Sequence, residues 1–502
     1  MLQKFEIDDR QQYWEKFMKN LVFNGIHNSV DGELLQDLCD NFKLESVTAV
    51  TFNESFIIDT ALNCGNLEQL NFYKIVYGIY PDSTHSVIDQ EVMDRISPYL
   101  FSILKMMDRL PPNLVYGFED RMKMLFEHVR YWDNLLIEKK VDMFISTNYP
   151  HQIFDYIAYA LCKSRGIKTL FFTQTQLDGY VQIIQTIEDN DLRLKKPFPV
   201  QVNKSGLPEL VEQQFNNLTS EEPAAPFYMK ENVEILRKKR QINFNLFKYG
   251  QELYRLFMQH MYSDKKFSRR VIDKLFYRKI SGSAAEKKLR RSYKQLSCEP
   301  NYMEQYIYVP LHFQPECTTS PQGGVFVYQE LMISILAKNM PANSKLYVKE
   351  HPVQEIHGRD LAFYNRLISL PNVKLIKLEI NSNDLIDNCV AVATITGTAA
   401  WEALFKEKPV LLFGDIWFKY TPGVFSIKTN DDCKTAVSTI FDINFISQTR
   451  SQLRTYLANI QPYLVRGYSD PLYGNVSKIR SEENRENLAN AMILAVKRCS
   501  GE

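Results

Sequence analysis

The sequence predicts an α/β protein built from two doubly wound parallel sheets, each covered by helices. Strand-like and helix-like segments alternate over residues 1–190 and again over 301–430, with a basic, aromatic-rich stretch between them. The chain has 502 residues, more than the ~250–300 at which a single hydrophobic core stops growing. These three observations together predict at least two domains of parallel sheet type.

The first alternating region contains a complete strand–helix–strand unit. Residues 46–53 (SVTAVTFN) are rich in β-branched side chains, which favour a strand. A strand at 141–147 leads into a helix over 151–165, which Gly166 ends, and a strand follows at 167–173. Such a unit within ~30 residues predicts a parallel strand pair with a covering helix.

The second alternating region reads as a doubly wound sheet almost without interruption. Its expected elements, in order, are strand 305–313, loop 315–324, helix 325–340, strand 345–349, strand 372–378, helix 382–389, strand 390–396, helix 397–408 and strand 409–414. Each strand is short and apolar, as in a sheet that is buried on both faces. Helical stretches are expected from 430 to 498.

We expect four parts along the chain. A Rossmann-like domain covers 1–225, and a basic helical segment covers 226–300. A second Rossmann-like domain covers 301–430, and the helices of 431–502 pack back across the domains.

The bulk composition indicates a cytoplasmic protein. The eight cysteines are scattered and form no CxxC pair or metal-ligand spacing, which is typical of reduced, packed thiols. The first residues, MLQKFEIDDR, have acidic side chains where a signal peptide needs an apolar core. No run of about 18 apolar residues occurs, so no membrane span is predicted. The net charge of +1 argues against a general nucleic-acid binder.

The segment 230–295 departs from this balance, with 19 Lys+Arg against 6 Asp+Glu, an excess of 19 − 6 = 13. Its charges alternate with aromatic residues at roughly helical spacing. A solvated, lysine-rich helical pair is one interpretation. A surface that rests on anionic lipid or glycolipid is another, since each basic residue near a membrane contributes about 1 kcal/mol. Nucleic acid is a third, but no nucleic-acid module accompanies the segment.

The stretch LYVKEHP (346–352) ends the second strand of the 301–430 domain in polar residues. Ligands of open α/β sheets bind at the carboxyl ends of the strands. The His351 imidazole can contact a phosphate or a ribose, Pro352 fixes the turn, and Lys349 adds positive charge beside Glu350. A His-Pro pair that only shapes a turn is the structural alternative.

A second strand end carries Thr396, Gly397 and Thr398 into a helix. Glycine allows a close backbone approach, and the free N–H groups and positive dipole end of the helix favour a phosphate. An ordinary helix cap is the alternative. Further ligand-binding candidates at these strand ends are Glu402, His312, Gly323 and Gly324.

The 1–225 domain offers a carboxylate at a strand end. Asp178 and Gly179 follow the strand 167–173, where a general base would face a ligand. A plain Asp-Gly turn is the structural alternative. Other candidates on this side are His151, Asp155, Gln174 and Glu188.

Taken together, these motifs resemble the GT-B glycosyltransferases. The His351-Pro352 pair after a strand resembles the nucleotide-binding signature of bacterial sialyltransferases and capsule Kdo transferases, which use CMP-activated sugars. The string from 311 to 414 is also similar to capsule and surface-polysaccharide biosynthesis proteins. The resemblance is good over 305–425 and moderate over 141–190.

The resemblance implies two Rossmann-like domains that face a cleft. It implies that His351 contacts the CMP phosphate, with Thr396 and Thr398 in the places of a helping Ser/Thr pair. These families also carry an acidic-acidic-Gly motif whose second carboxylate is catalytic. This chain has Leu177-Asp178-Gly179, so the first acidic position is lost and only Asp178 is carried over.

We therefore expect a metal-independent glycosyltransferase without a cofactor. It transfers a sugar from a nucleotide-activated donor, a CMP-linked acidic sugar, to a growing bacterial surface polysaccharide or lipid-linked glycan. Residues 1–225 bind the acceptor, and residues 301–430 bind the donor. The basic stretch 230–295 holds the enzyme against the inner face of the cell membrane, and no nucleic acid is bound.

Three other functions stay open at this point. A CDP-polyol phosphotransferase of the teichoic-acid type would use a similar donor and similar basic helices. A non-catalytic paralogue that binds glycan or scaffolds an assembly complex is favoured by the lost acidic residue at Leu177, whereas Asp178 and His351 argue against it. A sugar-nucleotide epimerase shares the two-domain architecture but has no need of the basic segment.

Overall fold

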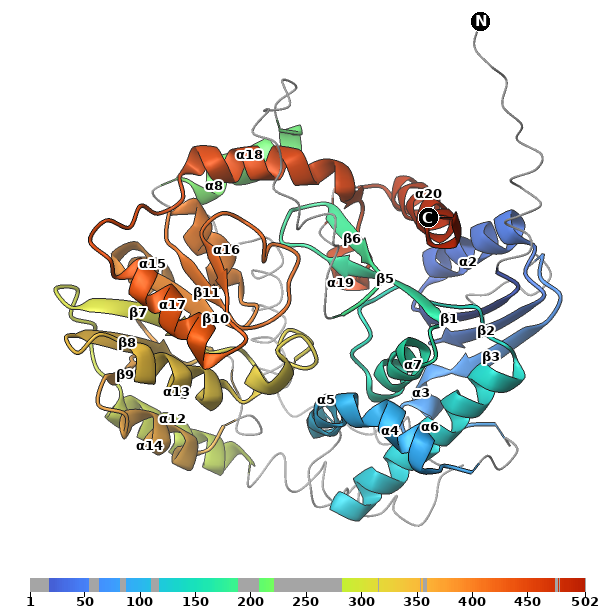
Figure 1. The fold of residues 1–502 in the computed structure, drawn as a ribbon, viewed down its shortest axis with the longest axis horizontal. Helices are drawn as coiled ribbons and strands as arrows, with labels where there is room; N and C mark the ends of the chain where they lie inside the picture. The colour runs from blue at the N-terminus through green and yellow to red at the C-terminus, as the bar shows by residue number, and fades with distance from the viewer. Residues whose placement is uncertain are drawn as a thin grey trace, which may run out of the picture. The chain divides into compact units, whose positions relative to one another are not determined.

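The fold consists of two compact α/β units. The computed structural model describes residues 18–53, 63–81, 87–109, 117–187, 207–220, 282–314, 316–352, 354, 359–474, 477 and 479–501. Unit 1 comprises Met1–Met106, Met122–Phe215 and Arg454–Glu502, and unit 2 comprises Met107–Arg121 and Asn216–Leu453. Each unit contains one mostly parallel sheet with helices packed on it (Figure 1), which confirms the predicted fold class.

Unit 1 contains a seven-stranded sheet of order β13-β6-β5-β4-β1-β2-β3. Its strands are β1 (Asn20–Ile26), β2 (Ser46–Thr51), β3 (Leu67–Asn71), β4 (Met143–Ser146), β5 (Lys168–Gln174), β6 (Tyr180–Ile184) and β13 (Val465–Arg466). Strands β3, β2, β1, β4 and β5 are parallel to one another, whereas β6 pairs antiparallel with both β5 and β13. The helices wholly or mainly in this unit are α2 (Ser29–Phe42), α3 (Phe72–Ile75), α4 (Gln90–Ile96), α5 (Leu100–Met106), α6 (Phe118–Glu138), α7 (Ile153–Ser164), α8 (Glu209–Leu218), α18 (Arg450–Ile460), α19 (Pro471–Gly474) and α20 (Ser481–Gly501).

One face of this sheet packs against α2 and α20, which come from opposite ends of the chain. Alternate residues of β1, such as Leu21 and Phe23, share a core with Leu35 of α2 and Met492 of α20. The other residues of the same strands point to the opposite face, as the strand period of two requires. Residues 454–502 belong to unit 1 through this packing.

Unit 2 contains a six-stranded, fully parallel sheet of order β12-β11-β10-β7-β8-β9. Its strands are β7 (Gln305–Pro310), β8 (Ser344–Lys349), β9 (Val373–Ile376), β10 (Ala391–Thr394), β11 (Val410–Leu412) and β12 (Val424–Ser426). Its helices are α12 (Gly282–Leu296), α13 (Gln329–Asn339), α14 (Leu361–Ile368), α15 (Ser382–Asn388), α16 (Thr398–Phe405) and α17 (Asn430–Ile440).

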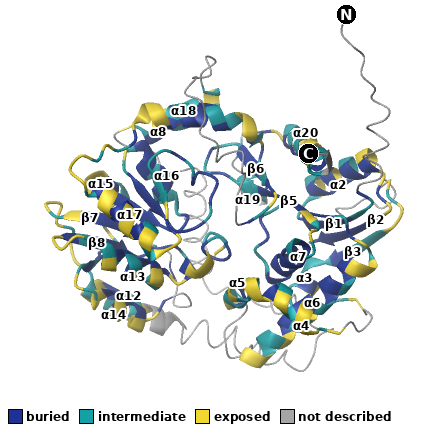
Figure 2. Cartoon of the chain, in the orientation of Figure 1, coloured by how far each residue is buried: buried dark blue, intermediate teal, exposed yellow. Residues whose placement is uncertain are grey.

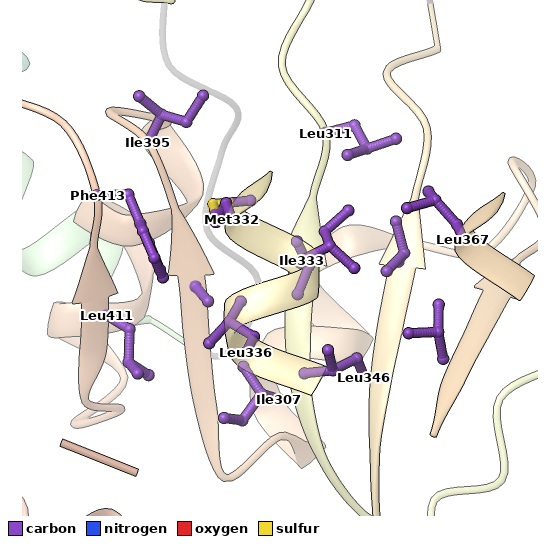
Figure 3. Packing of buried hydrophobic residues seen from close by; sticks show 14 of the residues in the cluster. Ile307, Leu311, Met332, Ile333, Leu336, Leu346, Leu367, Ile395, Leu411 and Phe413 are labelled. Carbon is purple, nitrogen blue, oxygen red and sulfur yellow. The ribbon is translucent and has the colours of Figure 1, made fainter. Parts of the chain in front are cut away.

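The core of unit 2 lies between one face of this sheet and helices α13, α14 and α17. Figure 3 shows Met332, Ile333 and Leu336 of α13 packed over Ile307 of β7 and Leu346 of β8. Helices α15 and α16 cover the other face. Figure 2 shows the central strands of both sheets as buried and the outer helix surfaces as exposed. The edge strands β3, β12 and β13 are mostly intermediate in burial.

The expected elements over 141–173 and 305–414 are present, with ends shifted by a few residues. Gly166 has φ +72° just after Arg165, the C-cap of α7, in the left-handed conformation that glycine adopts freely. Residues 226–281 of the expected basic segment 226–300 lie outside the described residues. Its last part is α12, whose Tyr293 packs into the unit 2 core.

Candidate functional site

The candidate residues of unit 2 lie at strand ends close to the point where the strand order reverses. From β7 the chain builds β8 and β9 on one side, and then β10, β11 and β12 on the other. The reversal therefore lies between β7 and β10, and ligands of open α/β sheets bind at the carboxyl ends of such neighbouring strands. His312 follows β7, Thr396 follows β10, and His351 follows β8 on the far side of β7.

His312 joins the ends of β7 and β10. Its Nε2 accepts the Thr396 N–H at 3.3 Å and lies 2.8 Å from the Thr394 hydroxyl. Burial, and then the charges of His351 and Arg359, lower the His312 pKa to about 3. His312 is therefore neutral at pH 7 and holds the turn that opens α16.

Gly397 allows this turn to approach His312. Its φ of −67° suits any residue, but a Cβ there would lie 2.8 Å from Thr394 Oγ1 and 3.3 Å from His312 Nε2. We expect Gly397→Ala to lower the free energy of unfolding by about 1–3 kcal/mol, as overpacking does, measured by urea denaturation. Gly117→Ala is the matched control, because a Cβ there meets nothing within 4 Å. Equal stability of the two variants would contradict the prediction.

His351 is half-buried at the end of β8. Its backbone N–H donates to Glu350 Oε1 at 2.7 Å, and its ring centroid lies 5.8 Å from that of Phe313. Burial, followed by the charges of Arg359 and Lys349, lowers the His351 pKa to about 4. At pH 7 the side chain is a neutral imidazole, with one N–H donor and one acceptor nitrogen.

Glu350 holds a buried arginine that the sequence did not single out. Glu350 Oε2 lies 3.2 Å from Arg359 Nε and accepts the Tyr364 hydroxyl at 2.7 Å. Arg359 also donates to Gln314 Oε1 at 2.5 Å and to the His312 carbonyl at 3.1 Å. Arg359 therefore ties the end of β7 to the end of β8, and the Glu350 carboxylate is used within this network.

The Lys349 ammonium donates hydrogen bonds to the segment that leads into α15. Its Nζ donates to the Ile380 carbonyl at 2.5 Å and to the Ser382 hydroxyl at 3.1 Å. Burial lowers the Lys349 pKa. The ammonium thus fastens β8 to the start of α15.

The threonines of the TGT turn have different surroundings. The Thr396 hydroxyl donates to the Thr318 carbonyl at 2.7 Å, so it anchors the loop that follows β7. Thr398 is the first residue of α16 and is half-buried. Glu402 lies one turn further along α16. Burial raises the Glu402 pKa to about 7, partly offset by Lys406.

The Glu402 pKa predicts a pH-dependent stability. The folded-state pKa is raised from 4.5, so the stabilisation is complete below pH 4.5 and is lost as the pH rises through 7. We expect the wild-type protein to lose at most about 3 kcal/mol from this group. Glu402→Gln is expected to lack this contribution to the difference in the free energy of unfolding between pH 5 and pH 8, measured by urea denaturation. Glu379→Gln, at an exposed glutamate of the same unit, is expected to keep the wild-type dependence. An unchanged pH dependence in Glu402→Gln would contradict the prediction.

The loop after β7 is packed against the same turn. A Cβ on Gly323 would lie 2.6 Å from the Thr319 carbonyl oxygen and 2.9 Å from Ile395, so only glycine fits. Gly324 has φ +52° and open space around it, and Pro352 is exposed. The structure thus brings the donor-side candidates to one edge of one sheet, with several of them engaged in holding that edge.

The unit 1 candidates lie at two places: Gln174 and Asp178 near the end of β5, and His151 and Asp155 near the start of α7. Asp178 lies in the turn between β5 and β6, half-buried, with its N–H donating to Gln214 Oε1 at 2.9 Å. Gln174, at the end of β5, donates to the Tyr180 carbonyl at 3.1 Å. His151 Nδ1 lies 2.6 Å from the Tyr149 carbonyl oxygen. The remaining two candidates are Asp155, buried in the first turn of α7, and Glu188, which lies outside the described residues.

A family model described as "Capsule polysaccharide biosynthesis protein" matches residues 245–436. The matched segment contains the His351-Pro352 pair and the TGT turn. The resemblance to capsule polysaccharide biosynthesis proteins is therefore confirmed over this part of the chain. No curated protein matches the chain in sequence.

Solved structures that match this chain include a UDP-GlcNAc 2-epimerase from Methanocaldococcus jannaschii, with 10% identity, 89% of this chain and 100% of that chain covered, and a TM-score of 0.25. They also include Thermosulfurimonas dismutans KpsC, as a beta Kdo 2,7 transferase (11% identity, 72% and 88% covered, TM-score 0.30) and as a beta Kdo 2,4 transferase (12%, 70% and 87%, TM-score 0.29).

Among the described residues, no helix is both long and apolar enough to cross a membrane. Within the same residues, no group of three or more His, Cys, Asp or Glu side chains has a metal-binding arrangement.

Proposed function

We propose that this protein is a glycosyltransferase of capsule polysaccharide synthesis that takes its sugar from a nucleotide-activated donor. The donor is a CMP-linked acidic sugar, and the acceptor is a polysaccharide or a lipid-linked glycan. Neither a metal ion nor a cofactor takes part. The basic segment 230–295 rests on the anionic inner face of the cell membrane.

The proposal rests on the donors at the carboxyl edge of the unit 2 sheet, next to its strand-order reversal. There the partly exposed His351 follows β8 and the N-terminal end of α16 follows β10, on either side of β7. An imidazole N–H and the N–H groups at the N-terminus of a helix are donors suited to a phosphate. During transfer, charge builds up on the departing phosphate, and donors fixed in advance stabilise it.

In this proposal His312, Arg359 and Gly397 hold these donors in position. His312 accepts the Thr396 N–H of the turn that opens α16, and Arg359 donates to the His312 carbonyl and forms an ion pair with Glu350. Because their partners are all within unit 2, the phosphate site is organised before a ligand arrives. This is the condition under which such donors are most effective.

The test is a transfer assay with purified full-length protein. CMP-linked sialic acid, CMP-linked Kdo, UDP-GlcNAc and CDP-glycerol, each labelled in the sugar or polyol, are incubated with glycolipid extracted from source cells that lack the gene. We expect label in the glycolipid and release of CMP from a CMP-sugar. Incorporation of glycerol phosphate would instead identify a polyol phosphotransferase, and no incorporation from any donor would contradict the proposal.

In the same assay, Asp178→Asn tests the sequence-based prediction that Asp178 removes the acceptor proton. Loss of a general base lowers the rate by about 10²–10⁴-fold. A rate within threefold of the wild type would show that Asp178 is not the general base.

A further inference from the structure

Helix α12 has an apolar face and a strongly basic face. It packs beside α14 in unit 2 (Figure 1), and its apolar side chains Leu289, Tyr293 and Leu296 lie against the unit 2 core. The opposite face carries four cationic side chains that are exposed to solvent: Lys287, Lys288, Arg291 and Lys294. Lys287, Arg291 and Lys294 are four and three residues apart, so they form one row along the helix.

These four cations are not neutralised within the described part of the chain. Other basic residues of unit 2 are, because Lys374 pairs with Glu304 at 2.8 Å and Lys377 pairs with Glu299 at 2.7 Å. The four cations of α12 form no ion pair with any described residue. A row of cations without counterions on one helix face attracts an anionic partner.

Two exposed apolar side chains lie on the α12 side of α14. Tyr364 of α14 contacts Tyr293 of α12, with ring centroids 5.0 Å apart, so this side of α14 faces α12. Leu361 and Ile368 are three and four residues from Tyr364 and share its side of the helix. Each of the two is 38% exposed. Cations beside exposed aliphatic groups are typical of a surface that lies at a lipid–water interface, whereas a nucleic-acid backbone would leave the aliphatic groups without a partner.

The inner side of α12 holds the end of β8 that leads to His351. The Tyr293 hydroxyl accepts the Glu350 N–H at 3.0 Å, and Arg290 donates to the Gln354 carbonyl at 3.3 Å. These two bonds fix the chain on both sides of His351. A helix with its side chains is ~10–12 Å across, so a partner on the outer face of α12 lies about one helix diameter from this strand end.

Resting on the proposed function, we propose that the outer face of α12, with Leu361 and Ile368 of α14, is the surface by which unit 2 docks on an anionic lipid bilayer. The apolar face of α12 is used in the protein core, so the helix rests on the head groups through its cations and does not insert. Each basic residue at an anionic membrane raises the affinity about fivefold. Docking on this face sets the distance between the nucleotide edge of unit 2 and the membrane surface.

The test measures sedimentation of the full-length protein with vesicles of phosphatidylcholine, alone or mixed with phosphatidylglycerol. The double variant Lys287→Gln/Arg291→Gln is expected to bind the anionic vesicles about 20-fold more weakly than the wild type. Lys338→Gln/Lys434→Gln is its matched control, because it removes two exposed lysines from α13 and α17 of the same unit. The control is expected to bind like the wild type, and neutral vesicles or high salt are expected to abolish binding.

Leu361→Ser/Ile368→Ser is expected to weaken vesicle binding at least threefold without changing binding to a DNA duplex. Lys288→Gln/Lys294→Gln is expected to act like the first α12 variant, which guards against a local folding defect, and thermal unfolding checks each protein. Equal vesicle binding by the α12 variants and the control would overturn the inference, as would tighter binding to DNA than to anionic vesicles. Vesicle binding needs neither donor nor acceptor, so a protein that docks but transfers no sugar would overturn the proposed function alone.

Discussion

Replacing Arg359 with methionine is expected to destabilise unit 2 by about 3–5 kcal/mol. The Arg359 side chain is only 2% exposed and that of Glu350 only 5%. Methionine fills the space but leaves the Glu350 carboxylate buried without its countercharge, and it leaves Gln314 Oε1 and the His312 carbonyl without this donor. Denaturant unfolding, followed by the fluorescence of the unit 2 residues Trp401 and Trp417, measures the loss.

Arg366→Met is the matched control. Arg366 donates to Glu330 through two nitrogens, at 2.7 and 2.9 Å, but both side chains are partly exposed to solvent. Exposed pairs contribute little, so a small change is expected. Adding Glu350→Gln to Arg359→Met removes the unpaired charge and is expected to recover part of the stability. A loss of stability no larger than that of Arg366→Met would show that the Arg359 network does not stabilise unit 2.

Replacing His351 with alanine is expected to weaken nucleotide binding by about 10–100-fold. A hydrogen bond to a charged group contributes about 1.5–3 kcal/mol, and 1.4 kcal/mol is tenfold in affinity. With its pKa lowered to about 4, His351 contributes a neutral N–H rather than a charge. Calorimetric titration of the protein with CMP at pH 7 measures the effect, and His351→Asn, which retains a donor, is expected to bind between the two.

Asn343→Ala is the control for this measurement, because Asn343 is an exposed polar residue in the turn before β8, at the opposite end of the strand from His351. Its CMP affinity is expected to equal that of the wild type. A His351→Ala affinity within threefold of that control would exclude His351 from the nucleotide site.

The fold class was predictable because parallel strands buried on both faces leave a plain pattern of apolar runs and turns. The strands and helices of 305–414 follow this pattern, and the sheet order places His312, His351 and Thr396 on neighbouring strand ends. Chain order alone does not tell that β10 lies next to β7. The closeness of His312 to the TGT turn is therefore a result of tertiary structure.

Two parts of the structure were missed for physical reasons. Arg359 follows no strand and matches no motif, and its importance comes from burial beside Glu350, which only packing reveals. The strand β1 was also missed, although LVFNGIH (21–27) carries a signal: the apolar run LVF is followed by the polar and turn residues Asn24 and Gly25.

The central claim, a nucleotide-phosphate site at the β7–β8–β10 edge of unit 2, is tested most directly by thermal-shift titration of the wild-type protein with CMP, CDP, UDP, GDP and ADP. A ligand that binds only the folded state at 100 times its Kd adds about 2.7 kcal/mol of stability. We expect stabilisation by CMP or CDP that is lost in His351→Ala. Stabilisation by UDP or GDP alone would contradict the cytidine donor, and no stabilisation by any of the five nucleotides would contradict the site itself.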